Sequence, residues 1–334
     1  PDVPIIGMGG VENGRDTAAM REAGADIVGI GSLWARIHPS QWAAFFEALA
    51  EDSVRNTMLA TDFLLEERRM EYRPHRITAS YERPGGVKVI EMTGSVDYEA
   101  SQFVFLWLPG IGEKPFSVAG TGPLTFLIKD RGRISAALCS LQEGDTVYLR
   151  GAYGHAPPEC ENEEAIVIAG GTGVAVVPQL VKELTAANKA VEVYIGISRR
   201  GSETLEGEIS KYARCMVVPD DGESGRVIRY VVEDESGTFA RRTLYVVGPA
   251  NFMHRALREF TGFGGSPEQA FASVETPTRC GVGLCGECSC GGHLTCRQGT
   301  FLSAAFLERN GIDIEEITAE KAERHYSVPE AAAR

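Results

Sequence analysis

The cysteines of this chain gather near its C-terminal end, in a spacing that suits metal chemistry. Four of them form the pattern C-x4-C-x2-C-x7-C: Cys280, Cys285, Cys288 and Cys296. The first three have the plant-type ferredoxin spacing, in which cysteine thiolates bind the irons of a [2Fe-2S] cluster. Gly281, Gly283 and Gly286 permit the close backbone approach that a loop around such a cluster requires. The spacing therefore predicts a [2Fe-2S] cluster bound by these four thiolates.

Cys290 leaves the choice of ligands open, because it follows Cys288 by two residues and can replace a neighbouring cysteine. A zinc knuckle is the alternative to a cluster, although zinc sites favour paired C-x2-C arrangements and the wider first gap is unusual for them. Disulfides are less expected, since eight cysteines in 334 residues are few for a disulfide scaffold. The clustering instead indicates a metal site in a reducing cytoplasm. The other cysteines are expected to be packing residues: Cys139, Cys160 and Cys215.

A glycine-rich turn lies between an apolar stretch and a helix opened near Pro178. In this context backbone amides and a helix N-terminus can bind a pyrophosphate. A second turn of the same unit, Gly248-Pro249, joins a strand end to a helix start and can hold a nicotinamide. The alternative is that the glycines only permit tight turns between strands and helices. The first turn consists of Gly170, Gly171, Thr172 and Gly173.

Two shorter stretches combine a hydroxyl and a positive charge with a chain turn. They are Lys114-Pro115-Phe116-Ser117 and Gly132-Arg133-Ile134-Ser135, and the second is expected to open a helix. Neither is specific by itself, since Ser135 is also a good helix N-cap. The six histidines are scattered, and no acid, base or nucleophile of this chain is assigned to catalysis.

Composition and charge argue against several classes of function. The formal net charge of -13, with no cluster of five or more Lys or Arg, argues against binding to nucleic acid. The longest apolar run, residues 165–177, is shorter than the roughly 18 residues that a membrane span needs, so no membrane segment is expected. The chain begins at Pro1 inside an apolar strand, without an initiator Met or a signal segment, so we expect its natural N-terminus to lie further upstream.

The elements that must position these residues follow from the hydrophobic pattern. A β/α rhythm with parallel strands is predicted first, with strands over 4–8 and 26–30 and helices over 16–23 and 41–49. Alternating sequence follows and predicts an antiparallel barrel, with strands over 87–92, 103–108, 124–128 and 146–150. A parallel α/β rhythm then returns, with strands over 165–169, 191–197, 215–219 and 244–247 and helices over 178–187 and 251–260.

This pattern predicts a multidomain protein that combines α/β and β domains. We expect the truncated end of a β/α barrel over 1–52, a helical linker over 53–72, an antiparallel β-barrel over 73–158, a parallel α/β nucleotide-binding domain over 159–265, a small cluster domain over 266–308 and a tail over 309–334.

The order of these parts resembles the ferredoxin-reductase superfamily, and specifically the electron-transfer subunits of NAD-linked dihydroorotate dehydrogenases, over roughly residues 72–305. The resemblance implies that the stretch from Lys114 to Val118 lines the isoalloxazine and ribityl chain of FAD, and that the stretch from Gly132 to Ser135 binds its pyrophosphate. It also implies that the loop from Gly170 to Gly173 binds NAD. Two positions depart from the family pattern, since Lys114 stands where Arg is usual and Val247 where Cys is usual. NAD and NADP stay open, because Arg199 and Arg200 can receive a 2′-phosphate.

The N-terminal piece resembles the last two β/α units of the FMN-binding catalytic barrel of dihydroorotate dehydrogenase. Gly9-Gly10 and Gly31-Ser32 match the two turns that hold the FMN phosphate at the C-terminal ends of barrel strands. About fifty residues cannot close a barrel of roughly eight strands, so the catalytic base and most substrate contacts are expected in a barrel supplied in cis or as a separate subunit. Any other phosphate-binding barrel is the alternative.

Together these parts imply an electron-transfer function in pyrimidine (UMP) biosynthesis. NADH exchanges a hydride, whereas an iron-sulfur cluster takes one electron at a time, so a flavin must stand between them. On this hypothesis electrons pass from dihydroorotate-reduced FMN through the cluster and FAD to NAD+. One alternative is a related subunit that serves a sulfite reductase, a hydrogenase or an electron-bifurcating transhydrogenase. Another is a non-catalytic interaction fragment with zinc in its cysteine loop.

Overall fold

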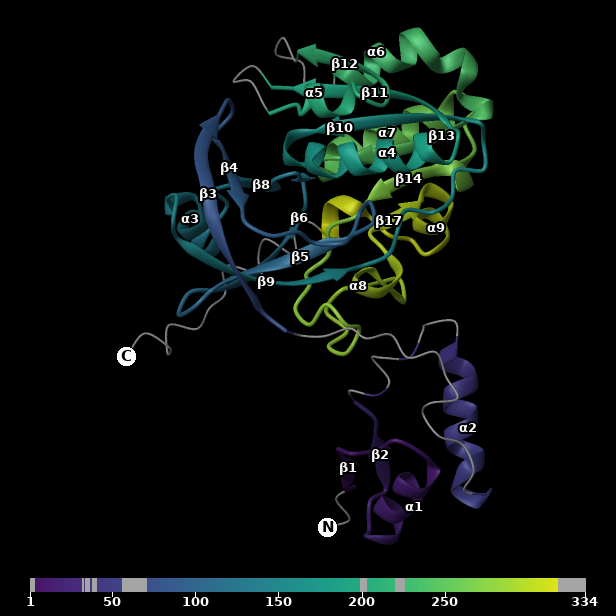
Figure 1. Ribbon diagram of the computed structural model, residues 1–334. Helices are drawn as coiled ribbons and strands as arrows, with labels where there is room; N and C mark the ends of the chain where they lie inside the picture. The colour runs from purple at the N-terminus through teal and green to yellow at the C-terminus, as the bar shows by residue number, and fades with distance from the viewer. Residues whose placement is uncertain are drawn as a thin grey trace. The chain divides into compact units, whose positions relative to one another are not determined.

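The computed structural model describes residues 4–31, 33, 37, 41–55, 71–198, 203–219 and 226–317. The chain divides into two compact units, one of residues 1–70 with 280–286 and one of residues 71–279 with 287–334. Figure 1 labels the helices and strands, which are described unit by unit below. Most of the expected helical linker, residues 56–70, lies outside the described residues.

The first unit begins with the predicted strand, helix and strand. β1 (Ile6–Met8) and β2 (Ile27–Gly29) pair in parallel, and α1 (Gly14–Glu22) connects them. Asn13 determines where α1 begins, because its Oδ1 accepts hydrogen bonds from the amides of Arg15 (2.8 Å) and Asp16 (3.3 Å) while Asp16 Oδ2 accepts the Asn13 N–H (3.1 Å). α2 (Trp42–Arg55) begins where predicted and continues past the expected boundary at residue 52. The parallel β/α order is thereby confirmed.

The second unit contains a seven-stranded antiparallel sheet, as the alternating pattern predicts. β3 joins its two halves, because residues 73–76 pair with β9 and residues 77–83 with β4. The strand order begins at β6 and ends at β7, and α3 (Arg133–Ser140) packs on the apolar core through Leu138. The strands in spatial order are β6 (Gly112–Ser117), β5 (Phe103–Leu108), β9 (Thr146–Tyr153), β3 (Arg73–Arg83), β4 (Val87–Met92), β8 (Leu124–Lys129) and β7 (Gly120–Thr121).

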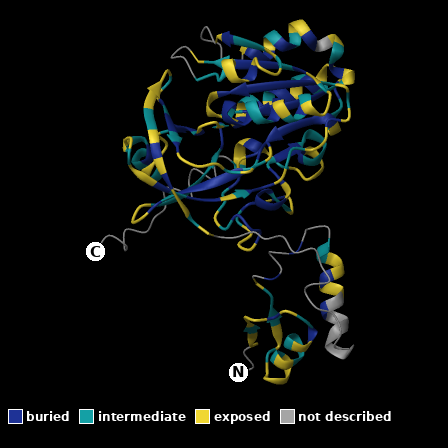
Figure 2. Ribbon diagram, viewed as in Figure 1, coloured by how far each residue is buried: buried dark blue, intermediate teal, exposed yellow. Residues whose placement is uncertain are grey.

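The other sheet of this unit has six strands and is parallel except at one edge. Successive side chains along its strands point alternately into two apolar cores, one on each face of the sheet. This explains why the sequence of β10 is continuously apolar. Val167 faces the core of α4 (Val177–Ala186), whereas Ile166 faces the core of α6 (Arg226–Glu235) and α7 (Ala250–Gly262). Figure 2 shows this buried sheet between its helices. The strands in spatial order are β12 (Arg214–Pro219), β11 (Ala190–Ile197), β10 (Glu164–Gly170), β13 (Arg242–Val247), β14 (Ala270–Ser273) and the antiparallel β17 (Phe301–Ser303).

None of the helices that the structure describes is long and apolar enough to span a bilayer. Several short elements complete the second unit. They are η4 (Gly171–Val176), α5 (Glu206–Ile209), η5 (Ser236–Arg241), η6 (Pro267–Gln269), β15 (Ser289–Cys290), β16 (His293–Leu294), α8 (Thr295–Gln298) and α9 (Ala304–Arg309).

Two expected boundaries shift in the structure. We expected a cluster domain over 266–308, but β14 and β17 lie within that range and pair as strands of the parallel sheet. The cysteine segment, residues 274–300, is therefore an insertion between β14 and β17 of this sheet. The tail expected from residue 309 also contributes to a core, because Ile314 is 4% exposed and packs with residues of α6 and α7.

Replacing Ile90 with Ala is expected to destabilise the antiparallel sheet by about 2–5 kcal/mol, because the buried side chain leaves a cavity. Ile111→Ala is the matched control, since Ile111 lies between β5 and β6 and is 36% exposed. The control is expected to change stability by less than about 1 kcal/mol. Urea unfolding followed by intrinsic fluorescence measures both variants. Equal unfolding midpoints would contradict the placement of Ile90 in this core.

Candidate functional site

The two glycine-rich turns predicted from the sequence lie next to each other. β10 and β13 are parallel neighbours with Ala169 opposite Val247, so the turns that follow them meet at one edge of the sheet. A Cβ on Gly173 would lie 2.8 Å from Val247 Cγ1 and 3.1 Å from the Gly248 amide nitrogen. The contact between the two turns therefore requires glycine at position 173.

Gly248 and Gly170 also permit close packing, because both lie next to the Phe252 ring. A Cβ on Gly248 would lie 2.8 Å from Phe252 Cδ1 and 3.3 Å from the Gly170 carbonyl oxygen. A Cβ on Gly170 would lie 3.4 Å from Phe252 Cζ. At these positions the structure supports the alternative interpretation, in which glycine permits close packing of the turns. Pro249 follows as the N-cap residue of α7.

Gly171 and Thr172 differ from their neighbours, because both are exposed. Gly171 has a φ of +61°, a left-handed conformation that favours glycine, and a Cβ there would meet nothing within 4 Å. The chain continues through η4 into α4, which has Pro178 in its first turn and, among the described residues, no side chain that caps its start. An exposed turn before an uncapped helix start is suited to binding a phosphate.

The residues predicted to line a flavin lie on an edge strand of the antiparallel sheet. Lys114, Pro115, Phe116 and Ser117 form the C-terminal part of β6, which pairs with β5, and all four are half-buried. The start of α3 packs close to the start of β6, because a Cβ on Gly112 would lie 3.2 Å from Ile134 Cδ1. The structure therefore brings the two predicted stretches into one region.

Ser135 holds the turn before α3 together and does not cap the helix. Its buried hydroxyl donates to the Gly132 carbonyl oxygen (3.0 Å) and accepts from the Arg131 amide (2.8 Å). The N-cap is Gly132, with a φ of +146° and no side chain to cover the helix start. Arg133 donates from Nη2 to the Gly110 carbonyl oxygen (3.4 Å). The uncovered helix start fits a negatively charged pyrophosphate.

The segment from Cys280 to Gly286 curls around the first cysteine sulfur. The amides of Val282 and Leu284 donate to Cys280 Sγ at 3.4 and 3.3 Å. The intervening glycines have positive φ angles, 80° at Gly281 and 81° at Gly283, which explains why this short loop needs them. Amides directed at a sulfur stabilise a thiolate, so this loop fits an iron ligand. Cys285 is exposed.

Cys288 and Cys296 lie side by side, with their sulfurs 3.2 Å apart and both residues buried. Cys290, on β15, is also buried but packs in the apolar core of α6 and α7, and burial raises the pKa of its thiol. Its place in this apolar core favours packing over iron binding for Cys290. Within the described ranges, no group of three or more His, Cys, Asp or Glu is gathered to hold a metal. The four-cysteine ligand set stays a prediction.

The turns matched to FMN phosphate lie at the ends of the first two strands. Gly9 and Gly10 directly follow β1, with φ angles of 101° and 67°, and Gly31 follows β2. Because β1 and β2 are parallel neighbours, their carboxyl ends share one edge. Ser32 lies outside the described residues, as do Arg199 and Arg200.

Sequence reasoning missed Arg150, a fully buried arginine on β9. Burial works to lower the pKa of its guanidinium, but hydrogen bonds to Glu113 and Tyr153 raise the pKa above its ordinary value. Arg150 therefore stays charged. The only signal in the sequence was a positive residue at the end of an apolar predicted strand.

Comparison with curated proteins gives a consistent result, although no family model matches the chain. The chain is 31% identical over 238 residues to the probable dihydroorotate dehydrogenase B (NAD(+)), electron transfer subunit, of Pyrococcus abyssi, covering 70% of this chain and 90% of that protein. It is 29% identical over 216 residues to the protein of the same name from Thermoplasma acidophilum, covering 64% and 82%.

Solved structures show the same fold at lower identity. An NADH-dependent reduced ferredoxin-NADP oxidoreductase matches with a TM-score of 0.62 and 21% identity over 75% of this chain and 93% of that chain. A ferredoxin NADP+ reductase from Neisseria gonorrhoeae matches with a TM-score of 0.51 and 15% identity over 61% and 98%. The predicted ferredoxin-reductase fold, with an antiparallel and a parallel sheet, is confirmed.

Gly173→Ala is expected to lower the thermal unfolding temperature, because its methyl group would collide with Val247 and the Gly248 backbone. Gly207→Ala is the matched control, since Gly207 is exposed in the same domain and a Cβ there meets nothing within 4 Å. Thermal unfolding followed by circular dichroism measures both. If Gly173→Ala unfolds at the same temperature as Gly207→Ala, the two turns do not touch as described.

Proposed function

Since the chain belongs to the family of electron transfer subunits of dihydroorotate dehydrogenase B (NAD(+)), we propose that it carries electrons from dihydroorotate-reduced FMN of a catalytic partner to NAD+ in pyrimidine (UMP) biosynthesis. The observation that carries this proposal is topological. The two glycine turns and the inserted cysteine segment belong to one parallel sheet, so nucleotide and cluster elements share a scaffold.

We assign FAD to the region where β6 meets α3, within an FAD-binding domain of residues 73–158. Lys114, Pro115, Phe116 and Ser117 would line the ring system, and Gly132, Arg133 and Ser135 would hold the pyrophosphate. The uncovered start of α3 supports the second assignment, because a helix N-terminus favours negative charge. When bound, FAD supplies the exchange between a hydride and single electrons. The residues of this chain hold the ring on the edge strand and leave the proton chemistry of dihydroorotate to the partner.

We assign NAD to the two turns at the carboxyl edge of β10 and β13, within a domain of residues 159–265. The exposed turn at Gly171 and Thr172 would bind the pyrophosphate, and Gly248-Pro249 would lie beside the nicotinamide. Gly170 and Gly173 would act indirectly, because their missing side chains let the turns approach. The positions expected to receive a 2′-phosphate lie outside the described residues, so NADP is tested as the competing nucleotide.

We assign the [2Fe-2S] cluster to Cys280, Cys285, Cys288 and Cys296. Two observations support the fit: amides converge on Cys280 Sγ, and Cys288 and Cys296 already lie side by side. Thiolates are the ligands that iron-sulfur clusters require.

We further propose that residues 1–52 are the last two β/α units of an FMN-binding barrel, whose remainder is supplied in cis or as a separate subunit. Gly9, Gly10, Gly31 and Ser32 would hold the FMN phosphate. The strands support this assignment, because Ile5, Ile6, Met8 and Ile27 are each more than half exposed and need the cover that a complete barrel provides. The proposed location is the cytoplasm, where cysteines stay reduced.

The cofactor content tests the proposal directly. Protein purified without oxygen is expected to be brown-yellow, with non-covalent FAD and about two irons per chain. Cys285→Ser should lose the iron and keep the flavin, whereas the matched Cys290→Ser should keep both because Cys290 is a core residue. Metal analysis and visible spectra measure this. Zinc in place of iron would refute the cluster assignment, and loss of iron in Cys290→Ser would show that the fourth ligand is misassigned.

Two activity assays test the route of electrons. The chain alone should reduce an artificial dye with NADH but should not oxidise dihydroorotate, because residues 1–52 would supply only two of the barrel's β/α units. Adding the barrel should couple dihydroorotate oxidation to NAD+ reduction. Cys285→Ser should abolish this coupling and spare NADH-to-dye activity. Dihydroorotate-to-NAD+ transfer that survives in Cys285→Ser would exclude the cluster from the route, and coupling only to another class of partner, such as a sulfite reductase or a hydrogenase, would favour that alternative.

A further inference from the structure

Arg150 on β9 forms a two-pronged ion pair with Glu113 on β6. Its Nε donates to Glu113 Oε2 and its Nη2 to Glu113 Oε1, both at 2.8 Å. The arginine side chain is 0% exposed, so a charge with this burial needs such a partner. Glu113 directly precedes Lys114, the first of the residues assigned to the flavin. Arg150 therefore anchors the strand that would line the flavin ring.

Aromatic side chains fix the orientation of this pair. The Tyr72 hydroxyl donates to Glu113 Oε2 at 2.6 Å and accepts from Arg150 Nε at 3.1 Å. The guanidinium carbon lies 3.8 Å from the Phe105 ring centroid and 5.2 Å from that of Tyr153. A planar guanidinium satisfies a forked carboxylate and stacked rings at once, which a lysine ammonium cannot do.

The same guanidinium reaches the backbone next to the first cysteine of the cysteine segment. Arg150 Nη2 donates to the carbonyl oxygen of Arg279 at 2.7 Å, and Arg279 directly precedes Cys280. At the last of the four cysteines, the amide of Gly154 donates to the carbonyl oxygen of Cys296 at 2.9 Å. Gly154 directly follows β9. β9 and the residue that follows it thus contact the backbone next to Cys280 and at Cys296, the first and last of the four cysteines.

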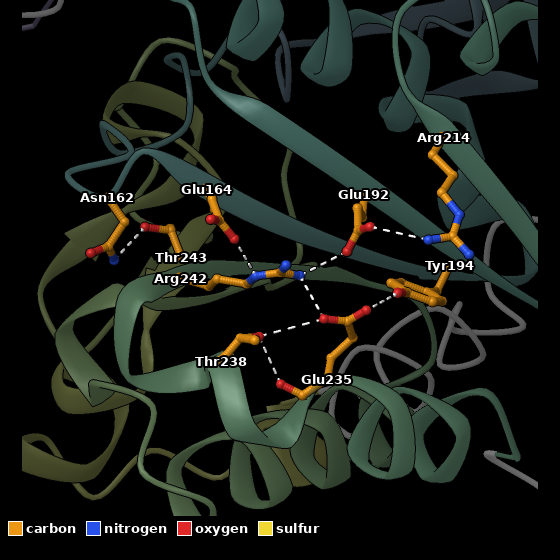
Figure 3. Close-up of polar contacts among 9 residues, drawn as sticks. All are labelled: Asn162, Glu164, Glu192, Tyr194, Arg214, Glu235, Thr238, Arg242 and Thr243. Atoms are coloured by element: carbon orange, nitrogen blue, oxygen red, sulfur yellow. Dashed lines mark hydrogen bonds and ion pairs between the residues drawn. The ribbon is translucent and has the colours of Figure 1, made fainter.

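Arg242 provides a contrast within the same chain (Figure 3). It is 12% exposed and pairs with Glu164 (2.7 Å), Glu192 (2.7 Å) and Glu235 (2.9 Å). Glu164 and Arg242 begin β10 and β13, so this cluster lies at the strand ends opposite the glycine turns. Arg242 therefore stabilises the parallel sheet at the edge away from the turns assigned to NAD.

We propose that Arg150 is a positioning residue that couples the flavin-lining strand β6 to the first cluster cysteine and so sets the rate of electron exchange between the two groups. This inference rests on the proposed FAD and cluster sites. Its physical basis is that one rigid, charged fork binds both the Glu113 carboxylate on β6 and the backbone carbonyl oxygen of Arg279. Residues that support a cofactor ligand in this way tune it without touching it. The buried positive charge next to residue 279 also favours the more negative, reduced state of a nearby cluster.

The test compares Arg150→Lys with Arg242→Lys, which keep the charge and lose the guanidinium fork. In Arg150→Lys, flavin and iron content and NADH-to-dye activity should stay at wild-type values, while stopped-flow reduction of the cluster should slow about 10- to 100-fold. Hydrogen exchange in residues 279–299 should accelerate in Arg150→Lys and not in Arg242→Lys. Arg150→Met, which also loses the charge, should in addition lower the midpoint potential of the cluster.

Equal cluster reduction and equal hydrogen exchange in the two lysine variants would overturn the proposal. If the wild-type protein holds no iron, the proposed function fails by itself, and hydrogen exchange in residues 279–299 still decides whether Arg150 positions this segment. If Arg150→Lys fails to fold, Glu113→Gln takes its place in the test, because this substitution weakens the same ion pair with little change in side-chain shape. Wild-type behaviour of Glu113→Gln would then overturn the proposal, and slowed cluster reduction with faster exchange would support it.

Discussion

The parallel pairing of β10 with β13 is the constraint on which the rest of the structure depends. It brings two turns into van der Waals contact at one edge of the sheet, where only residues without a side chain fit at Gly173 and Gly248. Those positions are fixed by packing, whereas Gly171 and Thr172 in the same turn stay exposed. The same sheet continues through β14 to β17 and carries the cysteine segment between them. The turns assigned to NAD and the cysteines assigned to the cluster are therefore parts of one scaffold.

The sequence predicted the elements whose hydrophobic pattern is strong. β4 and β5 have the expected bounds, and β10 and α4 differ from expectation by one residue at either end. β3 was missed because most of its side chains are exposed or half-buried, so backbone pairing with two strands holds it rather than an apolar face. β6 contains Pro115 and no fully buried residue, which gives no strand pattern either. The membership of β14 and β17 in the parallel sheet depends on pairing partners distant in sequence, which local pattern does not specify.

The candidate sites, like the fold, could be predicted from the sequence only in part. Cysteine type and spacing predicted four ligands, but the packing of Cys290 in the apolar core of α6 and α7 could not be predicted, since spacing contains no information about which thiol faces a core. Ser135 looked like an N-cap, and the structure gives that position to Gly132. Arg150 could not be found from the sequence, because Glu113 and Arg279 lie far from it along the chain and an arginine at a strand end is ordinarily solvated.

The insertion of the cysteine segment between β14 and β17 determines how the ends of this long loop are held together. The two ends of the segment are joined by the sheet itself, because Ser273 lies opposite Phe301 and the Val274 amide donates to the Thr300 carbonyl oxygen at 2.8 Å. Closing a loop of residues 275–299 is thus achieved by sheet formation, and its entropic cost does not fall on the binding of iron and sulfide. The loop is thus closed at its base by backbone pairing, and the conformation of its interior is free to be determined by what its cysteines bind.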